Sequence, residues 1–445
     1  MPFELSEVLE LIKSPEVTSQ IYRTLTLIGQ LIRNWWWVPL PFALWKPFSF
    51  LWLWWRKEIW LGKKKFIMLE VRIPSEILKP IRAMETVMAG LWQSLWAGPN
   101  WHEKWWDGQV FLNYSFEIVS IGGEIHFYIV CPADKKDIAE SIIFAQYPEV
   151  EISEVEDYTK NVPQDIPNKE WDLWGADYKL LRPDPYPIKT YKDFETESER
   201  MEEKRIDPLT VLLEAMAKVK PGEQLWVQVV AYPIGEEYVK PFQTAGLRIR
   251  DKLAKREEKP KKKSMFWEAF DLLVKGEVGV PKKETEMFPP EMRLTPGERD
   301  ILAAVEEKIS KLVFDTSIRF IFLGKRGVFY KANLRLVFGF FVSFFTAHLN
   351  GLVPFGTTIT KVKKNWYDWF WFNKRRLYLR QRKLFRNYVG RDSPLWPRSG
   401  GTFMLNTEEL ATLFHFPSRA GSLAPQVSRI EAKKGASPPG LPVEE

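Results

Sequence analysis

The chain has 445 residues, a formal net charge of +7 and 45% hydrophobic residues, the composition of a folded protein with room for two or three domains. A single cysteine, Cys131, excludes an internal disulfide framework and is typical of a reducing compartment. The first fourteen residues contain neither a basic region nor a small-residue cleavage site, so we expect no cleaved signal peptide.

A tryptophan-rich apolar stretch follows, from Trp35 to Leu61. Its first 21 residues, up to Trp55, carry one charge, Lys46, and a membrane-spanning helix needs ~20 predominantly apolar residues. Tryptophans gather at both ends, where their rings suit the membrane interfaces. Residues 1–62 are therefore predicted to form an N-terminal helix and a membrane anchor. The anchor residues are Trp35, Trp36, Trp37, Trp45, Trp52, Trp54, Trp55 and Trp60.

Basic residues directly after the stretch, Arg56 and Lys57 among them, predict its orientation. Such residues stay on the cytoplasmic side. We expect a single-pass protein of the cytoplasmic (inner) membrane, with membrane lipids as partners and the bulk of the chain in the cytoplasm. Because Pro39, Pro41 and Pro47 interrupt the stretch, an interfacial or re-entrant segment and a segment packed in a core remain alternatives.

Residues 66–160 show the element order βαββαβ. Strand patterns cover 66–73, 110–121, 124–131 and 150–157, and helix patterns cover 76–96 and 134–146. Gly122 and Gly123 mark a hairpin between the middle strands. This order predicts a ferredoxin-like unit.

A similar order returns over residues 174–362, with an insertion at about 236–313. The strands are expected at 178–181, 224–232, 317–325 and 357–362, and the helices at 208–219 and 328–349. The apolar part of the last helix is too short to span a membrane and indicates a core helix. Thr295, Pro296 and Glu298 predict a capping box at the helix that ends the insertion. The fold class is thus α+β: a membrane-spanning helix, then two ferredoxin-like units, the second with a helical insertion.

The positive charge is concentrated in a basic aromatic segment. Residues 361–391 hold eleven Lys or Arg and one acid, a net +10, so the rest of the chain sums to 7 − 10 = −3. Residues 363–392 are predicted to form a helix whose cations face an anionic surface, either a membrane or nucleic acid. A solvated helix packed on its own domain is the third alternative. The cations are Lys374, Arg375, Arg376, Arg380, Arg382, Lys383 and Arg386.

From residue 393 to 445 the chain is rich in Pro and Gly, which indicates a tail without a core of its own. One ordered piece, residues 403–417, interrupts it, with Asn406 or Thr407 as the helix cap. We expect this piece to dock on a partner. Its docking residues are Leu405, Leu410, Leu413, Phe414 and Phe416.

No motif for catalysis is found. The four histidines, at 102, 126, 348 and 415, lack the spacing of metal ligands, and no nucleophile motif is present. Gly62-Lys63 and Gly324-Lys325 lack the earlier glycine and the following Ser or Thr of a phosphate-binding loop. We expect no enzyme activity, no metal and no cofactor.

Several long strings resemble a bacterial family related to the ATPases that couple conjugation and type IV secretion. They lie at 69–92, 116–130, 144–159 and 403–417, with a shorter one at 429–434. In that family a membrane-anchored region of this kind precedes a HerA/FtsK-type motor, and this chain ends where the motor begins. The resemblance implies a separate P-loop ATPase as partner. A homo-oligomer is implied only by analogy with hexameric motors.

The sequence therefore predicts a non-enzymatic, membrane-anchored adaptor of a type IV secretion-like machine for DNA or protein translocation, which recruits that ATPase. The alternative is a membrane-tethered nucleic-acid-binding protein that acts through residues 361–391.

Overall fold

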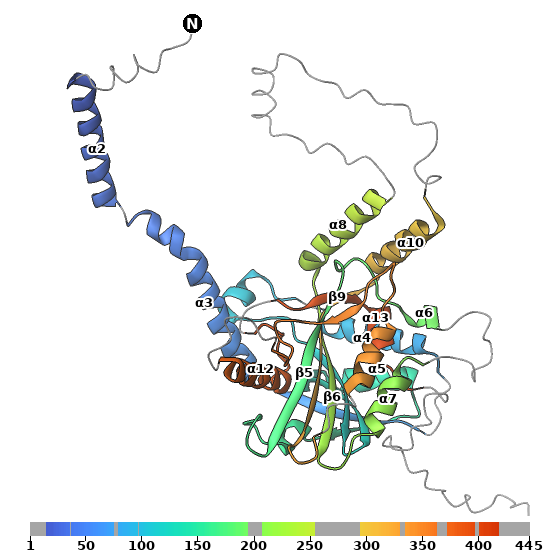
Figure 1. The fold of residues 1–445 in the computed structure, drawn as a ribbon. Helices are drawn as coiled ribbons and strands as arrows, with labels where there is room; N and C mark the ends of the chain where they lie inside the picture. The colour runs from blue at the N-terminus through green and yellow to red at the C-terminus, as the bar shows by residue number, and fades with distance from the viewer. Residues whose placement is uncertain are drawn as a thin grey trace, which may run out of the picture. The chain divides into compact units, whose positions relative to one another are not determined.

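The computed structural model describes residues 15–35, 37–74, 79–96, 98–194, 207–253, 294–329, 334–362, 372–396 and 400–417 (Figure 1). The chain divides into two compact units. The helical unit comprises Met1–Lys64 and Pro99–Val110, and the sheet unit comprises Lys65–Gly98 and Phe111–Glu445.

The helical unit contains α2 (Pro15–Trp35), α3 (Pro39–Lys63) and η1, a π-helical turn at Glu103–Asp107. Helix α3 begins with a proline in its first turn, where the missing N–H costs no hydrogen bond. The amide of Val38 donates to the carbonyl of Trp35 at 3.0 Å, which turns the chain between the two helices.

The predicted membrane-spanning helix is wrong. Among the described residues, no helix combines the length and the apolar character that a bilayer crossing requires. The apolar run is divided, because α2 ends at Trp35 and α3 begins only at Pro39. The remaining helix carries Lys46 and then Arg56, Lys57 and Glu58. The prediction of a single-pass protein of the cytoplasmic membrane depended on this helix, so it is wrong as well.

In the sheet unit, nine strands among the described residues form one sheet in which every pair is antiparallel. The order is β4-β1-β3-β2-β6-β7-β5-β8, and β9 pairs with β7. The strands are β1 (Phe66–Arg72), β2 (Tyr114–Ile121), β3 (Glu124–Pro132), β4 (Glu151–Val155), β5 (Trp171–Leu180), β6 (Glu223–Pro233), β7 (Val313–Lys325), β8 (Leu352–Pro354) and β9 (Phe403–Asn406).

The prediction of two ferredoxin-like units is also wrong, since all strands belong to one continuous sheet. Strands β2 and β6 pair from Tyr114 opposite Ala231 to Ile121 opposite Gln224. All but the last residue of β2 are buried. If β2 were the edge of a separate sheet, its outward N–H and C=O groups would be buried without hydrogen-bond partners. On either side of this pair the order is a mirror image: β2-β3-β1-β4 on one side and β6-β7-β5-β8 on the other.

Helices cover both faces of the sheet. One face carries α4 (Ile81–Leu95), α5 (Lys136–Gln146), α7 (Leu209–Ala217), α11 (Leu334–Ser343) and α13 (Thr407–Leu413) over the larger core. The opposite face carries α12 (Phe372–Val389) and a second core that includes Trp226. In Figure 1, α12 lies across the sheet from α5 and α7. Alternation along β6 explains both cores, because Leu225 and Val227 belong to the first and Trp226 to the second.

The other helices are short or lie near β9: α6 (Tyr191–Phe194), α8 (Glu236–Leu253), α10 (Pro296–Ser310), η2 (Ala133–Lys135) and η3 (Tyr158–Asn161). The capping box predicted for α10 is confirmed, with Thr295 and Glu298 exchanging both hydrogen bonds. Helices α8 and α10 pack closely at Gly246, where a Cβ would lie 2.4 Å from the Cγ2 of Ile309.

Other local predictions have mixed outcomes. The Gly122-Gly123 hairpin is confirmed, and both glycines have positive φ. Helix α11 is a core helix as predicted, with Phe340 and Phe341 buried, but it ends at Ser343. The strand expected at 357–362 is instead β8 at Leu352–Pro354, ahead of that segment.

We predict that Leu410→Ala lowers the free energy of unfolding of the sheet unit by about 2–5 kcal/mol, because it leaves a cavity in the larger core. Leu410 has no exposed surface. The measurement is urea unfolding followed by near-UV circular dichroism. Leu379→Ala is the control, since Leu379 on α12 is 53% exposed and its truncation leaves no cavity. Equal losses for the two variants would contradict the prediction.

Candidate functional site

The first candidate site is the aromatic surface of the helical unit, made by α3 and η1. The indole Nε1 of Trp52 donates to the carbonyl of Trp105 at 2.8 Å, and the guanidinium of Arg56 donates to the carbonyl of Trp106. The ring of Trp45 stacks on that of Trp105 with centroids 6.2 Å apart. Two side chains of α3 thus hold the η1 backbone, and the rings of Trp105 and Trp106 lie against those of Trp45 and Trp52.

Much of this aromatic surface is exposed. Phe42 is 81% exposed on α3, and Trp101, just before η1, is 69% exposed. A helix that is apolar on all sides is normally buried, and large exposed apolar patches mark sites of interaction. The other exposed apolar side chains of α3 are Leu40, Leu44, Trp45, Phe48, Phe50, Leu51, Trp54, Trp55 and Ile59.

The tryptophans predicted as an anchor do not lie on one helix. Trp35 is the last residue of α2, Trp37 lies in the turn before α3, and Trp36 is outside the described residues. The other five belong to α3: Trp45, Trp52, Trp54, Trp55 and Trp60. The structure brings Trp45 and Trp52 into contact with Trp105 and Trp106 of the η1 turn.

The second candidate is the basic helix α12. Its inner face is buried against the sheet through Leu384, Phe385 and Tyr388, which belong to the core around Trp226. Of the predicted cations, Lys374, Arg375, Arg382 and Arg386 are exposed, and Arg376, Arg380 and Lys383 are half-buried. Burial and the neighbouring Arg376 lower the pKa of Arg380.

A buried polar cluster holds the end of α12, and no pattern in the sequence indicated it. The guanidinium of Arg391 lies 2.9 Å from Glu117 on β2 and 2.9 Å from Asp157. The hydroxyl of Tyr158 donates to Glu117 at 2.7 Å and lies 2.8 Å from the hydroxyl of Tyr388. These groups are paired with one another, so we interpret the cluster as the attachment of α12 to the sheet.

The third candidate, the predicted docking piece, is folded into the protein's own sheet unit. Its residues 403–406 form β9, which pairs with β7, and α13 packs beside α4. The five predicted docking side chains are all buried in the larger core: Leu405, Leu410, Leu413, Phe414 and Phe416. In this structure they contact their own chain and offer no surface to a partner. Residues 418–445 lie outside the described residues.

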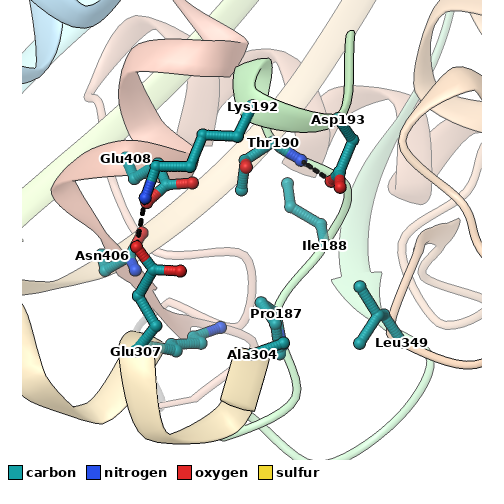
Figure 2. Close-up of a pocket in the computed structure, with 11 residues that line it drawn as sticks. Pro187, Ile188, Thr190, Lys192, Asp193, Ala304, Glu307, Leu349, Asn406 and Glu408 are labelled. Carbon is teal, nitrogen blue, oxygen red and sulfur yellow. Dashed lines mark hydrogen bonds and ion pairs between the residues drawn. The ribbon is translucent and has the colours of Figure 1, made fainter. Parts of the chain in front are cut away.

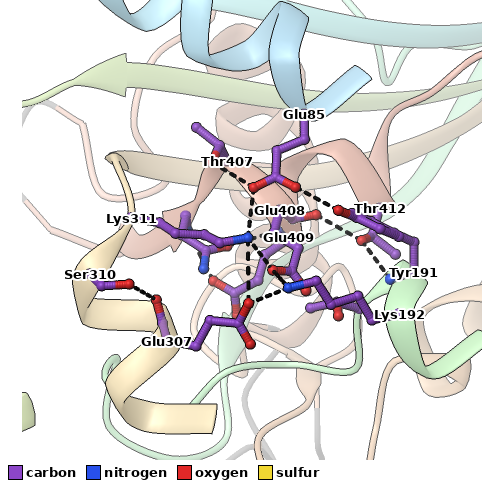
Figure 3. A network of polar contacts seen from close by, with 12 residues as sticks. Glu85, Tyr191, Lys192, Glu307, Ser310, Lys311, Thr407, Glu408, Glu409 and Thr412 are labelled. Atoms are coloured by element: carbon purple, nitrogen blue, oxygen red, sulfur yellow. Dashed lines mark hydrogen bonds and ion pairs between the residues drawn. The ribbon is translucent and has the colours of Figure 1, made fainter. Parts of the chain in front are cut away.

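Ion pairs attach α13 to three other helices (Figure 3). Lys311 pairs with Glu85 of α4 at 2.7 Å and with Glu408 of α13, while Lys192 of α6 pairs with Glu408 at 3.0 Å and with Glu307 of α10. Burial raises the pKa of Glu408, but hydrogen bonds from Lys311, Thr190 and Lys192 outweigh it, so the pKa lies below its ordinary value.

The adjacent pair, Lys308 and Glu409, has no exposed side-chain surface, and its charged atoms are 3.0 Å apart. Glu409 also accepts the amide hydrogens of Ile188 and Asn406, at 2.8 and 3.0 Å. The side-chain oxygen of Asn406 in turn accepts the amide hydrogen of Glu409, which confirms the predicted cap. Burial raises the pKa of Glu409 despite the attraction of Lys308.

A pocket of about 100 Å³ lies beside this network (Figure 2). Lys192, Glu307 and Glu408 line it, together with Thr190 and Asp193. The charged groups are engaged with one another, and Asp193 accepts the amide hydrogen of Thr190 at 3.0 Å. We interpret the pocket as a gap in the packing of α6, α10 and β9 rather than a reaction site.

No cluster of three His, Cys, Asp or Glu able to hold a metal is present within the part of the chain that the structure describes. His126 lies 2.7 Å from Glu70, and His415 lies 3.1 Å from Asp207, so each is used in a pair. Burial raises the pKa of Cys131 to about 12, which keeps the thiol protonated and unreactive.

The sheet unit is a mixed α/β fold, and the described residues present an exposed aromatic surface on α3 and η1 and an exposed cationic face on α12. A family model described as a domain of unknown function (DUF8128) matches residues 87–426. The chain belongs to this family. No curated protein gives a significant match.

We predict that Lys308→Met costs about 3–5 kcal/mol of stability, because it leaves the carboxylate of Glu409 buried without its counter-charge. Combining it with Glu409→Gln should restore a large part of this loss, since the amide is neutral and still accepts a backbone hydrogen bond. Urea unfolding of both variants measures the difference. If the double variant were less stable than Lys308→Met alone, the result would contradict an ion pair between Lys308 and Glu409.

Asp315 on β7 predicts a pH dependence of stability. Burial, together with the nearby Asp184, raises the pKa of Asp315 to about 6. The folded protein then retains a proton that the unfolded chain releases, so stability falls as pH rises from about 4 to 6. Asp315→Asn should gain stability relative to the wild type over this range, as measured by urea midpoints at several pH values.

The control for this experiment is Asp300→Asn, an exposed position on α10. The difference in unfolding free energy between this variant and the wild type should stay constant with pH. A constant difference for Asp315→Asn as well would show that Asp315 does not retain the proton.

Proposed function

We propose that the protein is a non-enzymatic adaptor of a type IV secretion-like translocation machine and that it recruits a separate P-loop ATPase through its aromatic surface. The observation that carries this proposal is the exposure of α3, whose apolar side chains from Phe42 to Ile59 have little cover from the helical unit itself. Such a helix is stable in water only when another surface covers part of it.

Two further features support an adaptor. The candidate catalytic groups among the described residues are paired with one another, as at Lys308 with Glu409 and at His415 with Asp207. The identity of the partner comes from the sequence strings that resemble the neighbours of HerA/FtsK-type motors. Because the former docking piece is buried, the proposed contact lies on α3 and η1 rather than on residues 403–417.

The shape of the surface explains why the contact is specific. Trp52 and Arg56 fix the η1 backbone, so Trp101, Trp105 and Trp106 are held beside α3 instead of moving freely. Aromatic anchors that are already ordered lose little conformational entropy on binding. A rigid patch of tryptophans next to Arg56 is typical of the residues that dominate protein interfaces.

The test is a pull-down of the tagged full-length protein after mild cross-linking in its native cells, with mass spectrometry of the captured chains. The variant Phe42→Gln, Phe50→Gln, Leu51→Gln replaces three exposed apolar side chains of α3. We expect a protein with a phosphate-binding GxxxxGK[ST] loop to be captured by the wild type and its recovery to fall at least about tenfold with the variant.

The matched control is Val211→Gln, Leu247→Gln, Val342→Gln, three exposed apolar positions on helices of the sheet unit. Its recovery of the ATPase should equal that of the wild type. Capture of no such ATPase, or the same recovery with both triple variants, would contradict the proposal.

A further inference from the structure

The outer face of α12 carries an ordered stripe of arginines. Arg375, Arg382 and Arg386 are exposed and stand at positions i, i+7 and i+11 of one helix, so they share a face. At a rise of 1.5 Å per residue the stripe is about 16 Å long. Exposed Lys374 lies beside it, and α12 contains no acidic residue.

The half-buried cations on the same helix support the stripe. Arg380 donates to the carbonyls of Ile359 and Lys361, both at 3.2 Å, and Lys383 reaches the carbonyl of Leu395 at 3.5 Å. The two carbonyls that accept from Arg380 carry no net charge, so its positive charge stays close to the stripe. The outer face therefore has a positive potential along its length.

The burial of the inner face distinguishes between the anionic partners that a basic helix can take. A helix that binds a membrane surface inserts its apolar side into the lipid. In α12 that side, with Leu384, Phe385 and Tyr388, is already packed on the sheet. The exposed face is left with charge, so a partner that offers regularly spaced negative charges fits it better than a lipid surface.

Aromatic rings accompany the arginines. The guanidinium of Arg386 lies 4.9 Å from the centre of the half-buried Trp396 ring, and Tyr378 is 44% exposed one turn from Arg382. Stacking of bases on aromatic rings beside cations is the way proteins hold single strands without reading their sequence.

We propose that the outer face of α12 binds single-stranded nucleic acid, with Arg375, Arg382 and Arg386 on the phosphates and Tyr378 and Trp396 beside the bases. This function is separate from the ATPase contact and uses a different surface, so either can fail without the other. No bases are read specifically, because the contacts are to phosphates and to the faces of the rings.

The experiment is fluorescence anisotropy of a labelled 20-nucleotide oligo(dT) with the full-length protein at several salt concentrations between 50 and 200 mM. The test variant is Arg375→Glu, Arg382→Glu, Arg386→Glu. We expect its affinity to fall at least about tenfold at 50 mM salt, and the slope of log affinity against log salt to fall by about 2, as for three lost phosphate contacts.

The matched control is Lys220→Glu, Lys240→Glu, Lys252→Glu, three exposed lysines on or next to helices other than α12 that give the same change in net charge, from +7 to +1. Binding by this control should stay within about twofold of the wild type, since only local cations contact the phosphates. Equal losses for the two variants, or none for either, would overturn the proposal.

Two further measurements identify the ligand class. A duplex of the same length should bind more weakly than the single strand, and equal affinity would overturn the assignment to single strands. Vesicles that contain phosphatidylserine should sediment equally with the wild type and the arginine variant. Loss of vesicle binding with unchanged oligonucleotide binding would assign the stripe to a lipid surface instead. Thermal unfolding of both variants checks that the exposed substitutions leave the fold intact.

Discussion

The pairing of β2 with β6 is the constraint on which the rest of the sheet unit depends. Eight consecutive residues of each strand are paired, and the strand order on the two sides of this junction is mirrored. The junction makes one sheet with two covered faces, so helices α4, α5, α7, α11 and α13 share one core. Helix α12 is then free to cover the other face, and its position there decides which of its residues reach the solvent.

Polar groups in this protein serve mostly to attach elements that come late in the chain. Arg391, Glu117 and Asp157 fasten the end of α12, and Lys308 with Glu409 fastens α13. Both groups are buried, where a charge without a partner is costly, so they specify where the elements sit more than they add stability. The two proposed contact surfaces lie elsewhere, on α3 and on the outside of α12.

Predictions that depend on neighbouring residues were reliable. Predictions of what packs against an apolar surface were not, because the packing partner lies far away in the sequence. The Thr295 and Asn406 caps, the Gly122-Gly123 hairpin and the core character of α11 follow from nearby residues, and the structure has them. The βαββαβ order cannot tell whether an edge strand such as β2 ends its sheet or pairs with β6, because that depends on residues a hundred positions away. Likewise, Leu410 and Phe414 are apolar whether they bind a partner or their own core. The composition of the segment predicted the cations of α12. The face that they occupy follows only from the structure, in which the side of the helix that carries Tyr388 is buried against the sheet.

The placement of α13 has a consequence for how the protein is made. Thr407 lies 3.4 Å from Glu85, although 322 positions separate them along the chain, and α13 completes the core over α4. During synthesis, the apolar surface that α13 covers stays open until residues 407–413 have left the ribosome. Contacts so distant in sequence form slowly, and nascent chains with open apolar surface aggregate readily. A chain truncated between β8 and β9 would therefore keep eight of the nine described strands but leave the larger core without Leu410, Leu413 and Phe414, and we expect it to aggregate.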